Sequence, residues 1–111
     1  MARSRLLKEN EERAINSLKE VLSKEFGLID LRLFGSKARG DSDFESDIDV
    51  MIEVAESNPD IESRIDDIVF KINLRDDVFI CPIIFSKKEI EEGPLAESPI
   101  YKIIQKEGIP L

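Results

Sequence analysis

Apolar residues recur at helical spacing in three stretches of the chain. The first covers about residues 4–26, where lysine and glutamate separate the apolar positions. The second follows Asn58-Pro59, a capping residue with proline at the first helical position, and the third follows Ser98-Pro99 and ends at Gly108. The predicted buried stripes are Leu7, Ile15, Leu18, Leu22 and Phe26, then Ile61, Ile65, Ile68, Val69 and Ile72, and last Ile100, Ile103 and Ile104.

Three shorter stretches have the pattern of strands. Ile29–Phe34 alternates apolar and polar residues, and Asp47–Val54 is a second strand. Val78–Phe85 is a continuous apolar run, typical of a strand covered on both faces. The residues Ser86–Glu89 form a capping box, which predicts a short helix ending before Gly93. Helices and strands thus follow one another along residues 1–111, which predicts one α/β domain with helices packed on a small sheet.

Composition narrows the classes of function. The chain has 111 residues, is 36% charged and carries a net charge of −8, without any long basic run, so a broad nucleic-acid surface is not expected. No apolar run approaches the ~20 residues that span a membrane. A single cysteine, Cys81, allows no internal disulfide and predicts a cytoplasmic location. The absence of histidine excludes chemistry based on imidazole.

Two aspartates lie close together on the second predicted strand. Asp47 and Asp49 are two residues apart, with Cα atoms about 7 Å apart, so their side chains share one face, while Ile48 and Val50 point into the core. Like charges at this distance repel, and a cation between them would offset the repulsion. Mg²⁺ is the expected ion, because it binds a few carboxylates together with substrate phosphates.

A calcium loop is the alternative metal site in this region. Asp41, Asp43 and Glu45 would supply its first three ligands. The pattern then departs twice, since Ser46 replaces the glycine of the sixth position and Ile52 the glutamate of the twelfth. We therefore expect Asp41 and Asp43 to lie in a solvated loop.

A Gly-Ser turn follows the first predicted strand directly. Gly35 would let the backbone approach a ligand closely, and the free amides after Ser36 suit a phosphate. The Ser36 hydroxyl can donate a hydrogen bond, and Lys37 or Arg39 can add positive charge. These residues are candidates for nucleotide binding, although a Gly-Ser pair alone is also common in capped surface turns.

The Gly-Ser turn and the aspartate pair together indicate a protein family more specifically than either feature alone. The run Gly35–Gly40, followed by Ser46-Asp47-Ile48-Asp49 and by the ending Ser98–Ile109, resembles the minimal nucleotidyltransferases of bacteria and archaea. These belong to the superfamily of DNA polymerase beta and kanamycin nucleotidyltransferase. The resemblance implies the nucleotidyltransferase fold (α+β), a small mixed β-sheet with helices packed on it. It also implies that Gly35 and Ser36 hold the outer phosphates of a nucleoside triphosphate, and that Asp47 and Asp49 bind Mg²⁺.

The resemblance implies a reaction as well, the transfer of a nucleoside monophosphate, AMP from ATP, to a hydroxyl. Many active relatives carry a third carboxylate on the next strand. Asp77 is the candidate for that catalytic and metal-binding role, although Asp76 and Asp77 could equally form a polar turn. Aligning that strand on Pro82 would instead place Phe79 at the position of the acid.

The acceptor of the nucleotide is expected to come from another molecule. Larger members of the family have a helical acceptor-binding domain, which we do not expect here. The resemblance implies a small helical HEPN-type protein as partner, in a toxin–antitoxin module, or a second copy of the chain. The alternative is a catalytically weak module that keeps the fold and acts by binding a partner.

Overall fold

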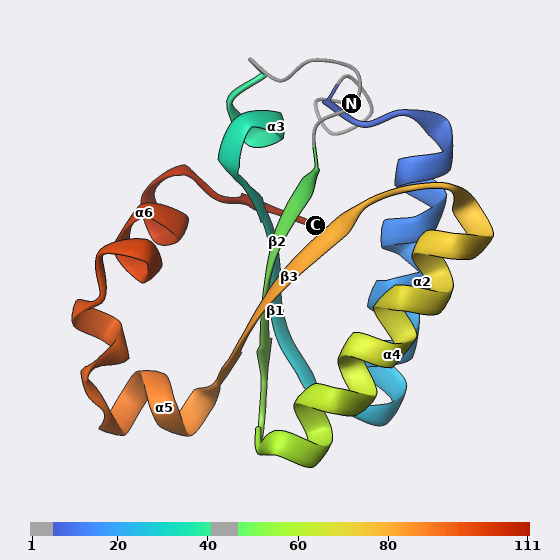
Figure 1. Ribbon diagram of the computed structural model, residues 1–111. Coiled ribbons are helices and arrows are strands. Elements are labelled where there is room, and N and C mark those ends of the chain that lie inside the picture. Colours follow the sequence, from blue (N-terminus) through green and yellow to red (C-terminus); the bar gives the residue numbers. More distant parts are fainter. Residues whose placement is uncertain (1–5, 41–46) are drawn as a thin grey trace.

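The computed structural model describes residues 6–40 and 47–111. Figure 1 shows a central sheet with helices on both sides. The helices are α2 (Glu9–Glu25), α3 (Gly35–Arg39), α4 (Pro59–Asp76), α5 (Lys87–Glu92) and α6 (Pro99–Glu107), with a 3-10 turn η1 (Pro94–Glu97). The strands are β1 (Leu28–Phe34), β2 (Ile48–Val54), β3 (Ile80–Ser86) and β4 (Ile109–Pro110). The predicted loop at Asp41 and Asp43 lies outside the described residues.

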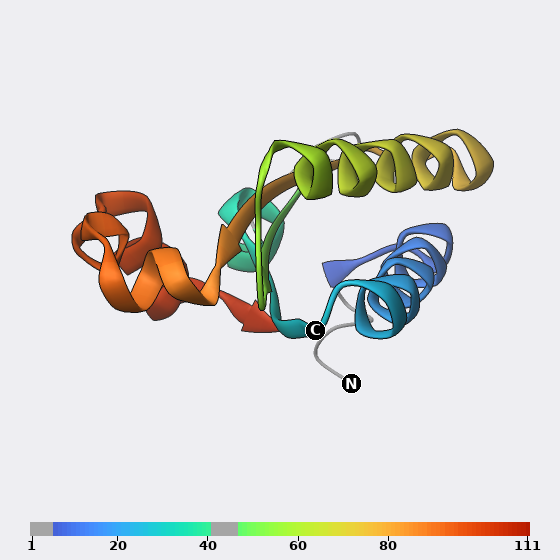
Figure 2. The same cartoon turned by 90° about the horizontal axis from the view of Figure 1, so that it is seen from below.

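The described strands form one mixed sheet in the order β3-β2-β1-β4. β1 runs antiparallel to β2 and β4, whereas β2 and β3 are parallel. Seen from below, α2 and α4 lie on one side of the sheet and α5 and α6 on the other (Figure 2). The predicted α/β domain with a small mixed sheet is therefore confirmed.

Each face of the sheet has its own apolar cluster. Alternate residues of β2, such as Ile48 and Val50, are fully buried toward α2 and α4, as predicted. The opposite face packs Met51 and Phe85 against Ile104 of α6. This second cluster covers only part of the face and does not include residues at the beginnings of β2 and β3.

Several predicted burials are wrong, for identifiable reasons. Ile29 is exposed and lies where the β1–β2 register shifts, between Leu28 and Asp30. Ile103 is 47% exposed and Ile100 is also exposed, because α6 buries only Ile104 against this small sheet. β3 is not covered on both faces. It is an edge strand, and Cys81 is exposed near its beginning.

Side chains limit backbone pairing at the beginning of the outer edge of β3. The backbone amide of Ile48 donates to the carbonyl of Phe79 at 2.7 Å, so Phe79 faces β2 and the backbone groups of Ile80 and Pro82 face outward. The Asn73 side chain accepts from the Ile80 amide at 2.9 Å and donates to its carbonyl at 3.3 Å. Pro82 has no amide hydrogen to offer. The edge beside the beginning of β3 therefore has few free groups for another strand.

Within residues 6–40 and 47–111, every helix is too short or too polar to cross a membrane.

Candidate active site

The Gly-Ser turn and Asp49 are in direct contact. Phe34, the last residue of β1, pairs with Asp49 of β2, which brings the next residue, Gly35, beside the Asp49 carboxylate. Gly35 has a φ of +75°, and a Cβ atom added there would collide with Asp49 Oδ2. The position thus needs glycine both for its backbone conformation and for the space that Asp49 occupies. A ligand held by the turn would lie next to this carboxylate.

The carboxylates of Asp47 and Asp49 influence each other. Burial raises the pKa of Asp49, and the nearby charge of Asp47 raises it further, while the positive charge of Arg39 lowers it. Asp47 is exposed and Asp49 is half-buried. The pair therefore combines like charges with partial loss of solvent, an arrangement that a bound cation would relieve.

Cys81 lies next to the two aspartates. It pairs with Asp49 in the parallel β2–β3 register. Burial raises the pKa of its thiol, as do the charge of Asp47, a hydrogen bond with Asp47 and the charge of Asp49. Because Cys81 lies in the apolar run Val78–Phe85, which predicted a strand covered on both faces, its exposure beside the aspartates was missed. Only the strand register could have revealed it.

The donor set suits Mg²⁺. Among the described residues, no group of three or more histidine, cysteine, aspartate or glutamate side chains could hold a metal ion. Asp47 and Asp49 are the two carboxylates that could hold the ion. Two carboxylates are sufficient for Mg²⁺, which keeps several waters and takes further oxygens from substrate phosphates.

The basic residues of the turn have different surroundings. Arg39 is half exposed, with Nη1 at 4.0 Å from Glu107 Oε2, and its charge acts on Asp49. Lys37 is 3% exposed, and its Nζ lies 3.2 Å from Oε2 of the equally buried Glu11. Lys37 was expected to face a nucleotide. Its ammonium group instead joins α3 to α2.

Asp77 does not join the aspartate pair. It is the C-terminal cap of α4, with a φ of +54°, and its carbonyl accepts a hydrogen bond from Asn10 at 3.3 Å. The register places Cys81 opposite Asp49, and the Ile48–Phe79 hydrogen bond places Phe79 beside Asp47. The role of Asp77 as the third carboxylate thus stays a prediction without support from its position.

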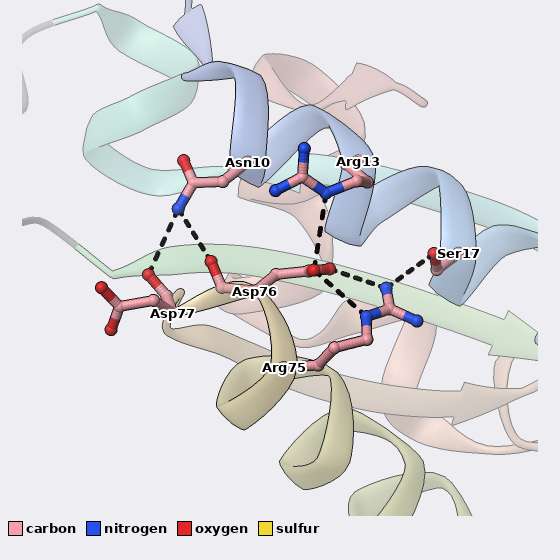
Figure 3. Close-up of polar contacts among 6 residues, drawn as sticks. All are labelled: Asn10, Arg13, Ser17, Arg75, Asp76 and Asp77. Carbon is pink, nitrogen blue, oxygen red and sulfur yellow. Dashed lines mark hydrogen bonds and ion pairs between the residues drawn. The ribbon is translucent and has the colours of Figure 1, made fainter.

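A polar cluster fixes the turn that leads into β3 (Figure 3). The buried Asp76 carboxylate accepts hydrogen bonds from Arg75, one of them at 2.7 Å, and lies 3.5 Å from Arg13 Nε. Hydrogen bonding by Arg75 is the main cause of a lowered Asp76 pKa. Arg75 also donates to Ser17 at 2.8 Å, and the Asp76 carbonyl accepts from Asn10 at 2.9 Å. These contacts bind the end of α4 to α2 and so set where β3 begins.

Comparison with known proteins relates the chain to nucleotidyltransferases. Residues 15–110 match the family model described as a nucleotidyltransferase domain. A candidate protein adenylyltransferase from Methanocaldococcus jannaschii is 42% identical over 73 residues, which are 64% of this chain and 72% of that protein. A crystal structure of a candidate nucleotidyltransferase from Sulfolobus solfataricus covers 88% of this chain and 76% of its own, with a TM-score of 0.55 and 22% identity. At that identity, the likeness concerns the fold alone.

Proposed function

The chain belongs to the nucleotidyltransferase domain family, and we propose that it transfers AMP from ATP to a hydroxyl group of an acceptor. The observation that carries the proposal is the contact between the Gly35 turn and the Asp49 carboxylate. It would bring phosphates bound at the turn to cations bound at the aspartates. The name of the M. jannaschii relative, a protein adenylyltransferase, supports AMP as the transferred group.

Each residue of the site has a part in this reaction. The backbone amides after Gly35 and the Ser36 hydroxyl would hold the β- and γ-phosphates at the beginning of α3. Arg39 would add a positive charge near the same phosphates. Lys37 would act indirectly, since its ion pair with Glu11 holds α3 in place.

Asp47 and Asp49 would hold Mg²⁺, which neutralises phosphate charge and acidifies a coordinated hydroxyl when bound. The remaining task of the chain is to fix the triphosphate so that its α-phosphorus lies at the aspartates. Transfer of a phosphoryl group depends mainly on such positioning and on charge, so the absence of histidine is no obstacle. Asp77 stays a predicted third carboxylate, and Asp77→Asn would test it.

The acceptor is proposed to be a protein. A small helical HEPN-type partner in a toxin–antitoxin module, or a second copy of this chain, remains the predicted source of the hydroxyl. The alternative, a catalytically weak module that binds a partner, is favoured by one observation. No third carboxylate joins Asp47 and Asp49 among the described residues.

The test is incubation of the protein with Mg²⁺ and ATP labelled at the α-phosphate, with and without the candidate partner. Release of pyrophosphate and appearance of label on an acceptor would support the transferase. Asp49→Asn and excess EDTA should abolish both signals. ATP binding without pyrophosphate release in any mixture would favour the binding module.

A further inference from the structure

The sheet order determines the side from which an acceptor reaches the α-phosphorus. In phosphoryl transfer, the attacking and leaving oxygens lie roughly in line on opposite sides of phosphorus. The turn at Gly35 ends β1, while β3 lies on the other side of β2, which carries Asp49. If pyrophosphate leaves toward the turn, as the proposed function requires, the acceptor hydroxyl lies toward β3.

The residue just before β3 exposes an aromatic ring on this side. Phe79 is 68% exposed, whereas its neighbours Val78 and Ile80 are buried in the core. Because side chains alternate along a strand, Phe79 shares its face with Cys81, which lies opposite Asp49. The Phe79 carbonyl accepts from the Ile48 amide, which places the ring next to the Asp47 end of the site.

Few backbone groups are free for pairing with another molecule at the beginning of β3. Asn73 already binds both outward backbone groups of Ile80, and Pro82 has no amide to donate. A molecule that approaches the aspartates over β3 therefore meets side chains rather than a free strand edge. Of these, Phe79 offers the large apolar surface.

We propose that Phe79 is the residue of the site that binds the acceptor, by packing against a flat apolar group next to the reacting hydroxyl. The inference rests on the proposed function. The acceptor oxygen bonds to the α-phosphorus, the bond from this phosphorus to the bridging oxygen breaks, and pyrophosphate leaves with the electron pair. The hydroxyl proton passes to water. Polyanionic acceptors are disfavoured, because the site holds Asp47 and Asp49 and the chain has a net charge of −8.

Two alcohols of similar size test the inference in the full chain. Benzyl alcohol is flat and cyclohexylmethanol is not, and each competes with water for AMP in the presence of Mg²⁺ and ATP. The measured quantity is the ratio of AMP ester to free AMP. We expect benzyl alcohol to give the higher ratio, and Phe79→Ala to reduce that ratio about two- to tenfold, as expected for loss of an aromatic contact. ATP binding, measured by calorimetry, should not change.

Phe70→Ala is the matched control, since Phe70 is similarly exposed, at 60%, but lies on α4, on the other side of the sheet. It should leave the ester ratio unchanged. Equal ratios for the two alcohols, or an unchanged ratio in Phe79→Ala, would overturn the inference. Weaker ATP binding in Phe79→Ala would assign the ring to the nucleotide base instead. If the parent chain makes neither ester nor free AMP from ATP, the proposed function itself fails, and the inference with it.

Discussion

Replacing Gly35 by alanine should disrupt ligand binding at the site far more than it destabilises the fold. An alanine at a φ of +75° is in the left-handed region, which costs about 1–2 kcal/mol for an L-residue. The new methyl group would also meet Asp49 Oδ2. That oxygen is the end of a short side chain that can rotate away, so the collision should move the carboxylate rather than unfold the protein.

Gly40→Ala is the matched control for this change. Gly40 has a φ of +76°, and its added Cβ would lie 3.8 Å from the nearest atom, Leu6 Cδ2, an ordinary contact distance. Both variants should therefore lose about 1–2 kcal/mol of unfolding free energy in urea. Only Gly35→Ala should also lose binding of Mg²⁺ and ATP, because only this substitution displaces the Asp49 carboxylate.

Calorimetric titration with ATP in Mg²⁺, beside urea unfolding of the same samples, measures both quantities. The reasoning is refuted if Gly35→Ala binds ATP like the parent chain. It is also refuted if Gly40→Ala loses ATP as completely as Gly35→Ala, since the effect would then come from backbone strain in α3 and not from Asp49.

The remaining predictions concern charges and hydrogen bonds of the site. Lys37→Met should lower the unfolding free energy by about 3–5 kcal/mol, because it leaves Glu11 buried without its ion pair, and adding Glu11→Gln should restore part of the loss in urea unfolding. Asp49→Asn should raise the melting temperature of the metal-free protein at pH 7. The folded-state pKa of Asp49 is raised, so ionisation of this residue opposes folding above its unfolded pKa, and the gain should vanish below about pH 4. Ser36→Ala should weaken ATP binding by roughly 1.5–3 kcal/mol in calorimetry while AMP, which lacks the outer phosphates, is hardly affected.

The elements of the fold could be predicted from sequence because their signals are local. Ser86 and Glu89 form the expected capping box, and Asn58 caps α4 as predicted. Ile48 and Val50 are buried as the alternation of β2 requires. β4 was missed because a two-residue strand is too short to show any period.

The arrangement of the site depends on contacts between distant segments, which the sequence alone does not reveal. The motif predicted that Gly35 and Asp49 belong together, but not that they touch. Lys37 looks like a phosphate ligand in the sequence, and only the position of α2 shows that Glu11 takes its charge. Cys81 lies in an apolar run that predicts a covered strand, and only the β2–β3 register places it opposite Asp49.

The small number of free backbone groups at the beginning of β3 affects the tendency of the protein to aggregate in a concentrated solution. An open strand edge is a template on which identical chains join into larger sheets and aggregate. Here Asn73 already binds both outward backbone groups of Ile80, and Pro82 has no amide to donate, next to the exposed Phe79. The other edge of the described sheet is β4, only two residues long. Pairing with the sheet of a neighbouring copy is therefore disfavoured at the beginning of β3, next to the exposed Phe79 ring.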